Sequence, residues 1–306
     1  MEYVGTILIL IAIYVMLSAS YNLVIGYGGL STVAHPIFFA IGAYTTGLLA
    51  VHTSIPPPVN VLLGAAAAVL ASVLLAASAL RVSGDYLLIA SLGFQLGLLQ
   101  LIQNLDFTGG PGGLSAIPGT ITGPLRTPAY LAICTACAVA TVFAVRAIVR
   151  GPYGRAVAAM RDEELAFTAL GRNAMSLKIV LFAIGCGIAG VAGGLYAYFF
   201  QYISPDQFDV LASAAILTMV VLGGMGTVYG PVVGSVLLLA VPQAITFLQL
   251  PPSIMAPMQG IIFTLLVLIF LFVRPAGILG GQPRKPRPAA LAGATAEPLR
   301  TGVPGE

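Results

Sequence analysis

The chain has 306 residues, of which 58% are hydrophobic and only 8% are charged, and its mean hydropathy is +1.01. Soluble globular domains carry about 25% charged residues, so the composition excludes an ordinary soluble domain and indicates a protein that crosses the membrane several times. The net charge of +3 is small, and it gives no reason to expect nucleic acid as a partner.

Nine hydrophobic stretches follow one another along the chain: 4–26, 31–51, 59–80, 86–105, 129–149, 178–202, 211–223, 231–249 and 256–273. A membrane helix needs about 20 apolar residues, whereas a barrel shows short segments of alternating hydrophobicity. We therefore expect an all-α, polytopic transmembrane bundle of about nine spans. The stretch 211–223 is short, and Pro36 and Pro231 lie near the starts of theirs, so broken or re-entrant segments that change the count by one or two are the alternative.

One long polar passage, residues 150–178, separates the fifth and sixth stretches. It carries Arg150, Arg155, Arg161, Arg172 and Lys178. Short loops rich in Lys and Arg lie on the cytoplasmic side of membrane proteins. Counting spans outward from this loop puts the N-terminus outside and the C-terminus in the cytoplasm, and it leaves Arg126 as the one basic residue on the outer face.

The sequence predicts one transmembrane domain and one tail. The domain covers residues 1–281 and includes the cytoplasmic loop 150–178. The tail, 282–306, is rich in Pro, Ala and Gly and has no apolar periodicity, so we expect it to be disordered on the cytoplasmic face. No Lys or Arg precedes the first apolar run, which we interpret as a retained span and not as a cleavable signal peptide.

Motifs for catalysis, metal binding or a cofactor do not appear in the sequence. Cys134, Cys137 and Cys186 all lie inside apolar runs, where cysteine usually acts as a small buried hydrophobe. There is no GxxxxGK[ST] phosphate-binding loop and no cluster of His and carboxylate residues. We expect no enzyme activity, cofactor or metal, and any ATP-derived energy must come from another protein.

An internal repeat links two Gly-rich segments, GGLSTVAHP at 28–36 and GGMGTVYGP at 223–231. Each follows an inward-running stretch, so the two are parallel copies. Corresponding Gly- and Pro-interrupted segments point to the translocation site in transporters, because freed backbone groups need protein or a water-filled path as partners. A pair of tight turns is the alternative. The candidate path residues are Gly28, Gly29, Ser31, Thr32, His35, Gly223, Gly224, Thr227 and Tyr229.

Small residues also recur at intervals of four between positions 183 and 194, among them Gly190 and Gly194. This spacing lets two helix backbones approach closely. From the sequence, the face that these residues form packs either inside the subunit or against a partner subunit.

The polar loop has the composition of a helix from residue 154 to 170, with Pro152 ahead of it and Gly171 as a stop. Four apolar residues fall on one face of such a helix: Val157, Met160, Phe167 and Leu170. Both a solvated loop helix and a helix that docks into a groove of a partner fit this pattern.

Several longer stretches carry a family resemblance. They are GPYGRAVAAMRDEELAFTALGRN with SLKIVLFAIGCGIAGVAGGLYA, NLVIGYGGLSTVAHPIFFAIGAYTTGLL, SGDYLLIASLGF, TGGPGGL, SPDQFDVLASAAILTMVVLGGMGTVYGPVVGS and RPAGILG. Together they resemble the permease subunits of branched-chain amino-acid ABC importers, in particular the M-type partner of the H-type. The resemblance covers nearly the whole chain up to Gly281. Permeases for urea and short amides look similar and remain an alternative, as does a self-sufficient carrier or channel.

The resemblance implies a subunit of the bacterial inner membrane that imports leucine, isoleucine and valine. It implies three kinds of partner: a homologous permease, two cytoplasmic ATP-binding subunits, and a periplasmic or extracellular substrate-binding protein. It also identifies Arg155 to Gly171 as a coupling helix that seats in a cleft of the ATPase. The residues assigned to coupling are Arg155, Arg161, Asp162, Glu163, Glu164, Ala166 and Gly171. Related chains often carry an acid near position 95 or 96, where this chain has Gln95 and Leu96.

Overall fold

The computed structural model describes residues 2–79, 85–119, 121, 123, 125–246, 260–261, 264–265, 268, 272 and 277–280. Within these residues the regular structure is helical, and β pairing is limited to one isolated bridge between Leu114 and Ile203. The all-α prediction is therefore confirmed. The predicted tail 282–306 and most of the ninth hydrophobic stretch lie outside the described residues.

The helices follow the hydrophobic stretches closely. The first half of the chain forms α1 (Glu2–Asn22), the π-helical turn η1 (Leu23–Tyr27), α2 (His35–His52), α3 (Pro57–Ala79) and α4 (Asp85–Asn104). The middle forms the short turns η2 (Asp106–Thr108) and η3 (Gly110–Gly112), then α5 (Arg126–Arg150), α6 (Pro152–Asp162) and α7 (Glu164–Ala169). The second half forms α8 (Ala174–Phe200), η4 (Pro205–Phe208), α9 (Val210–Gly223) and α10 (Gly230–Thr246).

Six stretches of the described residues are long and apolar enough to cross a membrane: Glu2–Tyr27, Pro57–Ala77, Tyr86–Asn104, Arg126–Arg150, Ala174–Phe200 and Pro205–Gly223. The last of these is a broken segment, because η4 and the short α9 share it. α10 is shorter, and α2 is buried along most of its length. Each of the first eight predicted stretches thus holds one helix, while the total of nine spans stays a prediction.

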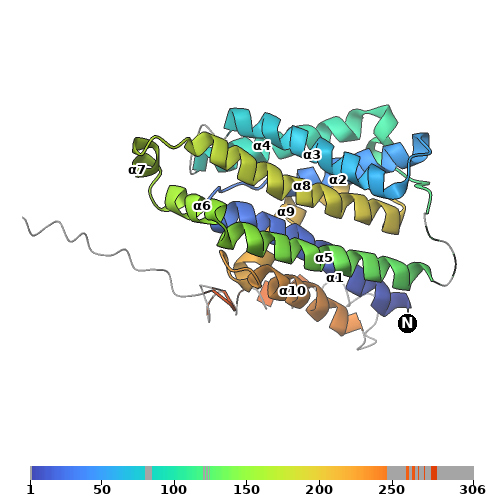
Figure 1. Ribbon diagram of the computed structural model, residues 1–306. Helices are drawn as coiled ribbons and strands as arrows, with labels where there is room; N and C mark the ends of the chain where they lie inside the picture. Colours follow the sequence, from blue (N-terminus) through green and yellow to red (C-terminus); the bar gives the residue numbers. More distant parts are fainter. Residues whose placement is uncertain are drawn as a thin grey trace, which may run out of the picture.

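The centre of the bundle is formed by α1 and α8. α8 packs against α2 and α3, and α1 packs against α5, α8, α9 and α10 (Figure 1). A side chain on Gly42 of α2 would overlap the backbone of Gly190 on α8, and a side chain on Gly193 would overlap the Phe39 carbonyl. The small-residue face predicted on α8 therefore packs inside the subunit.

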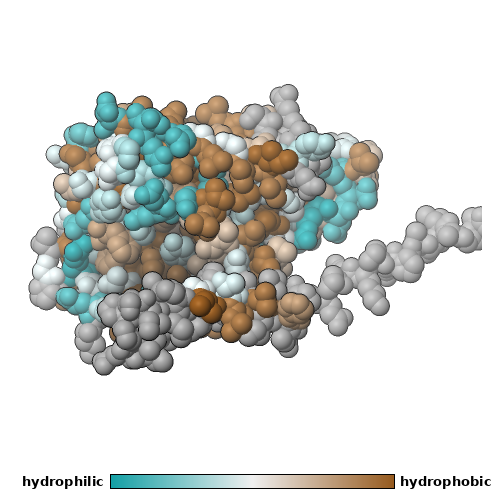
Figure 2. Space-filling view, turned by 180° about the vertical axis from the view of Figure 1, so that it is seen from behind, coloured by the Kyte–Doolittle hydropathy of each residue, from teal (hydrophilic) through white to brown (hydrophobic). Residues whose placement is uncertain are grey.

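The two ends of the bundle differ in charge. α6 and α7 lie at one end and the N-terminus at the other (Figure 1), and hydrophobic side chains gather between the more hydrophilic ends (Figure 2). At the N-terminal end, Arg126 donates a hydrogen bond to the Phe199 carbonyl and thereby joins α5 to α8. The end that carries α6 and α7 holds six basic residues: Arg146, Arg150, Arg155, Arg161, Arg172 and Lys178.

Candidate functional site

The polar segment 150–178 folds into two helices, so the single helix predicted from 154 to 170, and with it a continuous coupling helix from Arg155 to Gly171, is wrong. Glu163 separates α6 from α7 with an extended backbone, φ −154° and ψ 93°. The break turns the chain so that Glu164 Oε1 lies 2.6 Å from Lys178 Nζ on α8. Because the Lys178 side chain is only 9% exposed, a continuous helix that carried Glu164 away would leave a nearly buried cation without this partner.

The break also divides the predicted apolar face. Val157, Met160 and Phe167 are buried as expected, in small clusters against the neighbouring helices. Leu170 is 80% exposed, so its predicted place on the buried face is wrong, and Leu165 is 79% exposed. The reason is that α7 starts in a new direction after Glu163. The tip of the polar segment therefore carries two leucines in contact with solvent.

α6 is fixed to the bundle by Tyr153. Its hydroxyl donates to the Leu177 carbonyl at 2.9 Å, and burial raises the pKa of Tyr153 above its ordinary value, so the phenol keeps the proton that it donates. All seven residues predicted to act in coupling are exposed: Arg155, Arg161, Asp162, Glu163, Glu164, Ala166 and Gly171. A surface anchored at its base and exposed at its tip suits contact with another protein.

The first span ends in the π-helical turn η1, which leads into the first Gly-rich segment. The Gly28 amide donates to the Leu23 carbonyl five residues back, at 3.1 Å. Single π turns inside α-helices are rare and occur often at functional sites. Here the turn presents the Gly26 carbonyl to α6, and Arg161 donates a hydrogen bond to it from Nη1. Gly29, at φ +67°, lies directly beneath the Arg161 side chain.

The second Gly-rich copy meets the end of the first span at the same place. The Asn22 side chain donates from Nδ2 to the Thr227 carbonyl at 2.8 Å and accepts from the Gly226 amide at 2.9 Å. A side chain on Gly26 would lie 2.6 Å from the Gly226 nitrogen. We name the group of Asn22, Gly26, Arg161, Gly226 and Thr227 the junction. It joins α6 and the turn that leads into the first copy to the second copy of the repeat.

The predicted path residues separate into two groups. Gly28, Thr32, His35, Gly223 and Gly224 are buried, whereas Gly29, Ser31, Thr227 and Tyr229 are at least partly exposed.

His35 belongs to the buried group and is enclosed by protein. Its Nε2 lies 2.8 Å from Ser20 Oγ, its ring stacks on Tyr21, and its Nδ1 has no hydrogen-bond partner. The Tyr21 hydroxyl in turn donates to the Thr32 carbonyl at 2.5 Å. These groups hold the first copy in shape.

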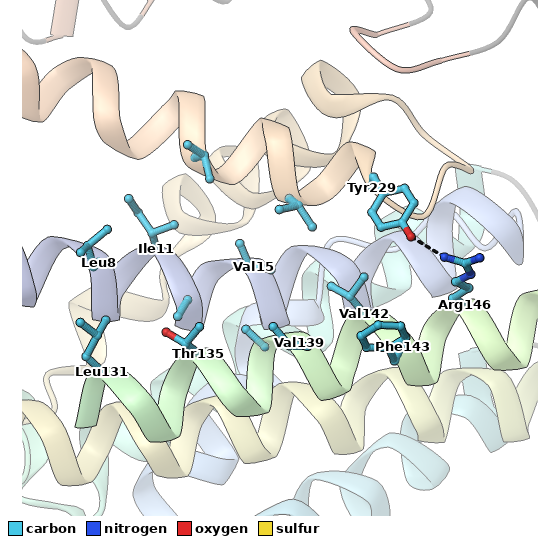
Figure 3. A pocket seen from close by; sticks show the side chains of 14 residues that line it. Leu8, Ile11, Val15, Leu131, Thr135, Val139, Val142, Phe143, Arg146 and Tyr229 are labelled. Carbon is cyan, nitrogen blue, oxygen red and sulfur yellow. Dashed lines mark hydrogen bonds between the residues drawn. The ribbon is translucent and has the colours of Figure 1, made fainter. Parts of the chain in front are cut away.

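A groove of about 570 Å³ lies between α1, α5 and α10 (Figure 3). Its walls are apolar except for Thr135, Arg146 and Tyr229. At one end, Arg146 Nη1 donates to the Tyr229 hydroxyl at 2.5 Å. Tyr229 is the one predicted path residue that lines this groove, and Arg146 was not among the predicted site residues.

Sequence reasoning also missed Asn22, Gly26 and Gly226 at the junction. The signals for them were weak: an amide inside an apolar run, and single glycines beside the Gly-Gly pairs at 28–29 and 223–224. Each makes contacts with residues about 200 positions away, which a reading of local spacing does not reveal.

Comparison with known proteins places the chain in a family. Residues 3–271 match the family model described as "Branched-chain amino acid transport system / permease component". The high-affinity branched-chain amino acid transport system permease protein LivM of Escherichia coli is 33% identical over 257 residues, and LivM of Salmonella typhimurium is 32% identical over 253 residues. Each alignment covers 74% of this chain and 60% of the relative.

A shorter match reaches the second permease type. LivH of Salmonella typhimurium is 34% identical over 127 residues, which cover 42% of this chain and 39% of that protein. No solved structure matches the chain. The family match spans most of the sequence, and the chain belongs to the permease components of branched-chain amino-acid transport systems.

Proposed function

We propose that this chain is an inner-membrane permease subunit of an ABC importer for leucine, isoleucine and valine. The family match over residues 3–271 and the likeness to LivM support this substrate class. The additional likeness to LivH supports a homologous permease as the partner across the translocation path. Two cytoplasmic ATP-binding subunits hydrolyse ATP, and a periplasmic or extracellular binding protein delivers the amino acid.

The charge distribution supports the orientation of the subunit. The end with α6 and α7 carries six basic residues, whereas at the opposite end α1 begins with Glu2 and α5 begins with a single arginine, Arg126. Since short cytoplasmic loops are enriched in Lys and Arg, α6 and α7 face the cytoplasm. The N-terminus then lies outside, and the cytoplasmic position of the tail from Arg274 stays a prediction from the sequence.

The observation that carries the coupling proposal is the position of α6 between an exposed tip and the junction. Leu165 and Leu170 present apolar side chains to solvent on the tip, which is the kind of anchor that a cleft on the ATPase takes up. Arg161 binds the Gly26 carbonyl of η1, and Asn22 joins η1 to the second copy. Movement of the ATPase thus reaches both Gly-rich turns, which open the path between the permeases alternately to each side.

Docking of the tip is tested with the double variant Leu165→Ser, Leu170→Ser in cells that contain the full assembly. Burying a leucine contributes about 1.5–3 kcal/mol, so we expect the variant to lose co-purification of the ATPase and at least about tenfold of its ATP-dependent uptake of radiolabelled leucine. Arg172→Gln, an exposed change in the same loop, is the control. Intact co-purification and uptake in the double variant rule out docking through this tip.

The same cells separate coupling from substrate class. Urea is supplied as a second labelled solute. If the cells take up urea but not leucine, and this uptake depends on Leu165 and Leu170, then urea is the substrate and the proposed coupling through the tip stands. Leucine transport by the isolated chain in vesicles without ATPase subunits overturns the importer proposal and supports a self-sufficient carrier.

A further inference from the structure

The groove between α1, α5 and α10 is apolar along most of its length and polar at one end. From Leu8 and Leu131 at one end to Val142 its walls are almost entirely apolar, with Thr135 as the only polar side chain in that part (Figure 3). Arg146 and Tyr229 close the other end. The groove is open along its side, since Val139 and Phe143 are exposed. Its occupant therefore needs one polar end and a long apolar part.

The polar end has free hydrogen-bond donors for an anion. Arg146 uses one N–H on the Tyr229 hydroxyl, and a guanidinium has five. Because the Tyr229 oxygen accepts that bond, its own O–H is free to donate outward. In the described residues the one ion pair joins Lys178 to Glu164, so no carboxylate neutralises Arg146 there. A planar guanidinium beside a phenol suits the oxygens of a phosphate group.

The length of the groove fits a hydrocarbon chain better than a transported amino acid. Leu131 and Arg146 are fifteen residues apart on α5, about 22 Å at 1.5 Å per residue, and the hydrocarbon core of a bilayer is about 30 Å thick. An amino acid that moved along this wall would need an acceptor for its ammonium group, and Thr135 is the only polar side chain on the way.

We propose that this groove binds an anionic phospholipid of the leaflet on the α6 side. The phosphate accepts hydrogen bonds from the free N–H groups of Arg146 and from the Tyr229 hydroxyl, and an acyl chain lies along the apolar wall between α1, α5 and α10. The proposal requires only that the chain crosses a membrane, so it stands independently of the transported substrate.

The absence of tryptophan from the sequence makes a direct test available. The full-length chain with Phe143→Trp, a reporter in the groove, is reconstituted into phosphatidylcholine vesicles that contain rising fractions of brominated phosphatidylglycerol. The matched control is Ile133→Trp on the same helix, in a second apolar groove of about 430 Å³ between α3, α5 and α8 that no basic residue lines. Quenching of each tryptophan gives the relative binding constant of the anionic lipid at that site.

We expect the anionic lipid to be preferred about fivefold at the Phe143→Trp site, the effect of one basic residue near an anionic membrane surface, and not at the Ile133→Trp site. Adding Arg146→Gln abolishes the preference, and Arg146→Lys retains most of it. Unchanged quenching of the Ile133→Trp reporter by brominated phosphatidylcholine checks that the Arg146→Gln chain is folded.

Three results overturn the proposal. Equal preference at both reporters shows that the groove has no special affinity for the anionic lipid. A preference that persists in Arg146→Gln removes the assigned headgroup site. Absence of quenching at the Phe143→Trp site by any brominated lipid shows that protein, such as a second copy of the chain, fills the groove.

Discussion

At the scale of single residues, Arg161 has the most consequential position in the molecule. It belongs to the exposed face of α6, yet its guanidinium reaches the Gly26 carbonyl of the first span. We propose that Arg161, which connects an exposed helix to a membrane helix, transmits movement between them. The role that we propose for Arg161 therefore differs from the one proposed for Leu165 and Leu170, which is to bind the ATPase.

We predict that Arg161→Gln uncouples transport from ATP hydrolysis without loss of the ATPase. A hydrogen bond from a charged group contributes about 1.5–3 kcal/mol, so uptake of leucine by the full assembly falls at least about tenfold while the ATPase still co-purifies and hydrolyses ATP. Arg172→Gln, an exposed change in the same loop and outside the predicted coupling residues, serves as the control. Equal losses in both variants count against a specific role for Arg161.

At the scale of elements, hydrophobic runs located eight helices but not the break at Glu163. Hydrophobic runs are enough to locate membrane helices because such a helix satisfies its own backbone hydrogen bonds. The composition of the segment therefore decides whether it forms a helix. The break brings Glu164 into an ion pair with Lys178 of α8. Because Lys178 lies outside residues 154–170, the composition of that segment alone does not predict this contact. The paired Gly-rich segments were visible as a repeat, whereas the contact of Asn22 with Thr227 depends on how α1 and the second copy pack.

The close contact at the junction predicts a contrast between two glycines. In Gly26→Ala the new methyl group overlaps the Asn22 side chain and the Gly226 backbone, and overpacking of this kind costs about 1–3 kcal/mol. Gly93 on α4 has no atom within 4 Å of an added methyl group, so Gly93→Ala leaves stability unchanged or raises it by up to about 1 kcal/mol.

The measurement is the midpoint of thermal unfolding of each full-length variant in detergent, followed by circular dichroism. Gly26→Ala should unfold at a lower temperature than the wild type, and Gly93→Ala should not. If the two variants unfold at the same temperature, η1 and the second Gly-rich copy are not held in contact at Gly26.

At the scale of the whole molecule, two charged ends and an apolar middle determine how the bundle sits in a bilayer. The apolar surface includes strongly exposed residues of α3 and α4, among them Leu70, Leu74 and Ile89. In water these exposed apolar side chains would favour aggregation. In the membrane, lipid tails or a partner permease would shield them from water. The same division of charge, read from the sequence alone, supplied the predicted orientation.

We predict that opposite ends of the bundle are labelled from opposite sides of the membrane. In a chain whose three cysteines are replaced by serine, Asp206→Cys should react with a membrane-impermeant maleimide in spheroplasts, and Arg172→Cys only after permeabilisation. Gel-shift detection of the labelled chain reports both. The reverse pattern places α6 and α7 outside and removes the basis for ATPase docking.

The side-chain amide of Asn22 can make both of its hydrogen bonds at the junction in only one orientation. Its oxygen faces the Gly226 N–H and its nitrogen faces the Thr227 carbonyl. If the amide rotated by half a turn, its NH2 group would face the Gly226 N–H and its oxygen would face the Thr227 carbonyl. Both hydrogen bonds would then be lost. The two hydrogen bonds therefore depend on one side chain, and any rotation of the Asn22 amide that breaks one of them frees the second Gly-rich segment from the other as well.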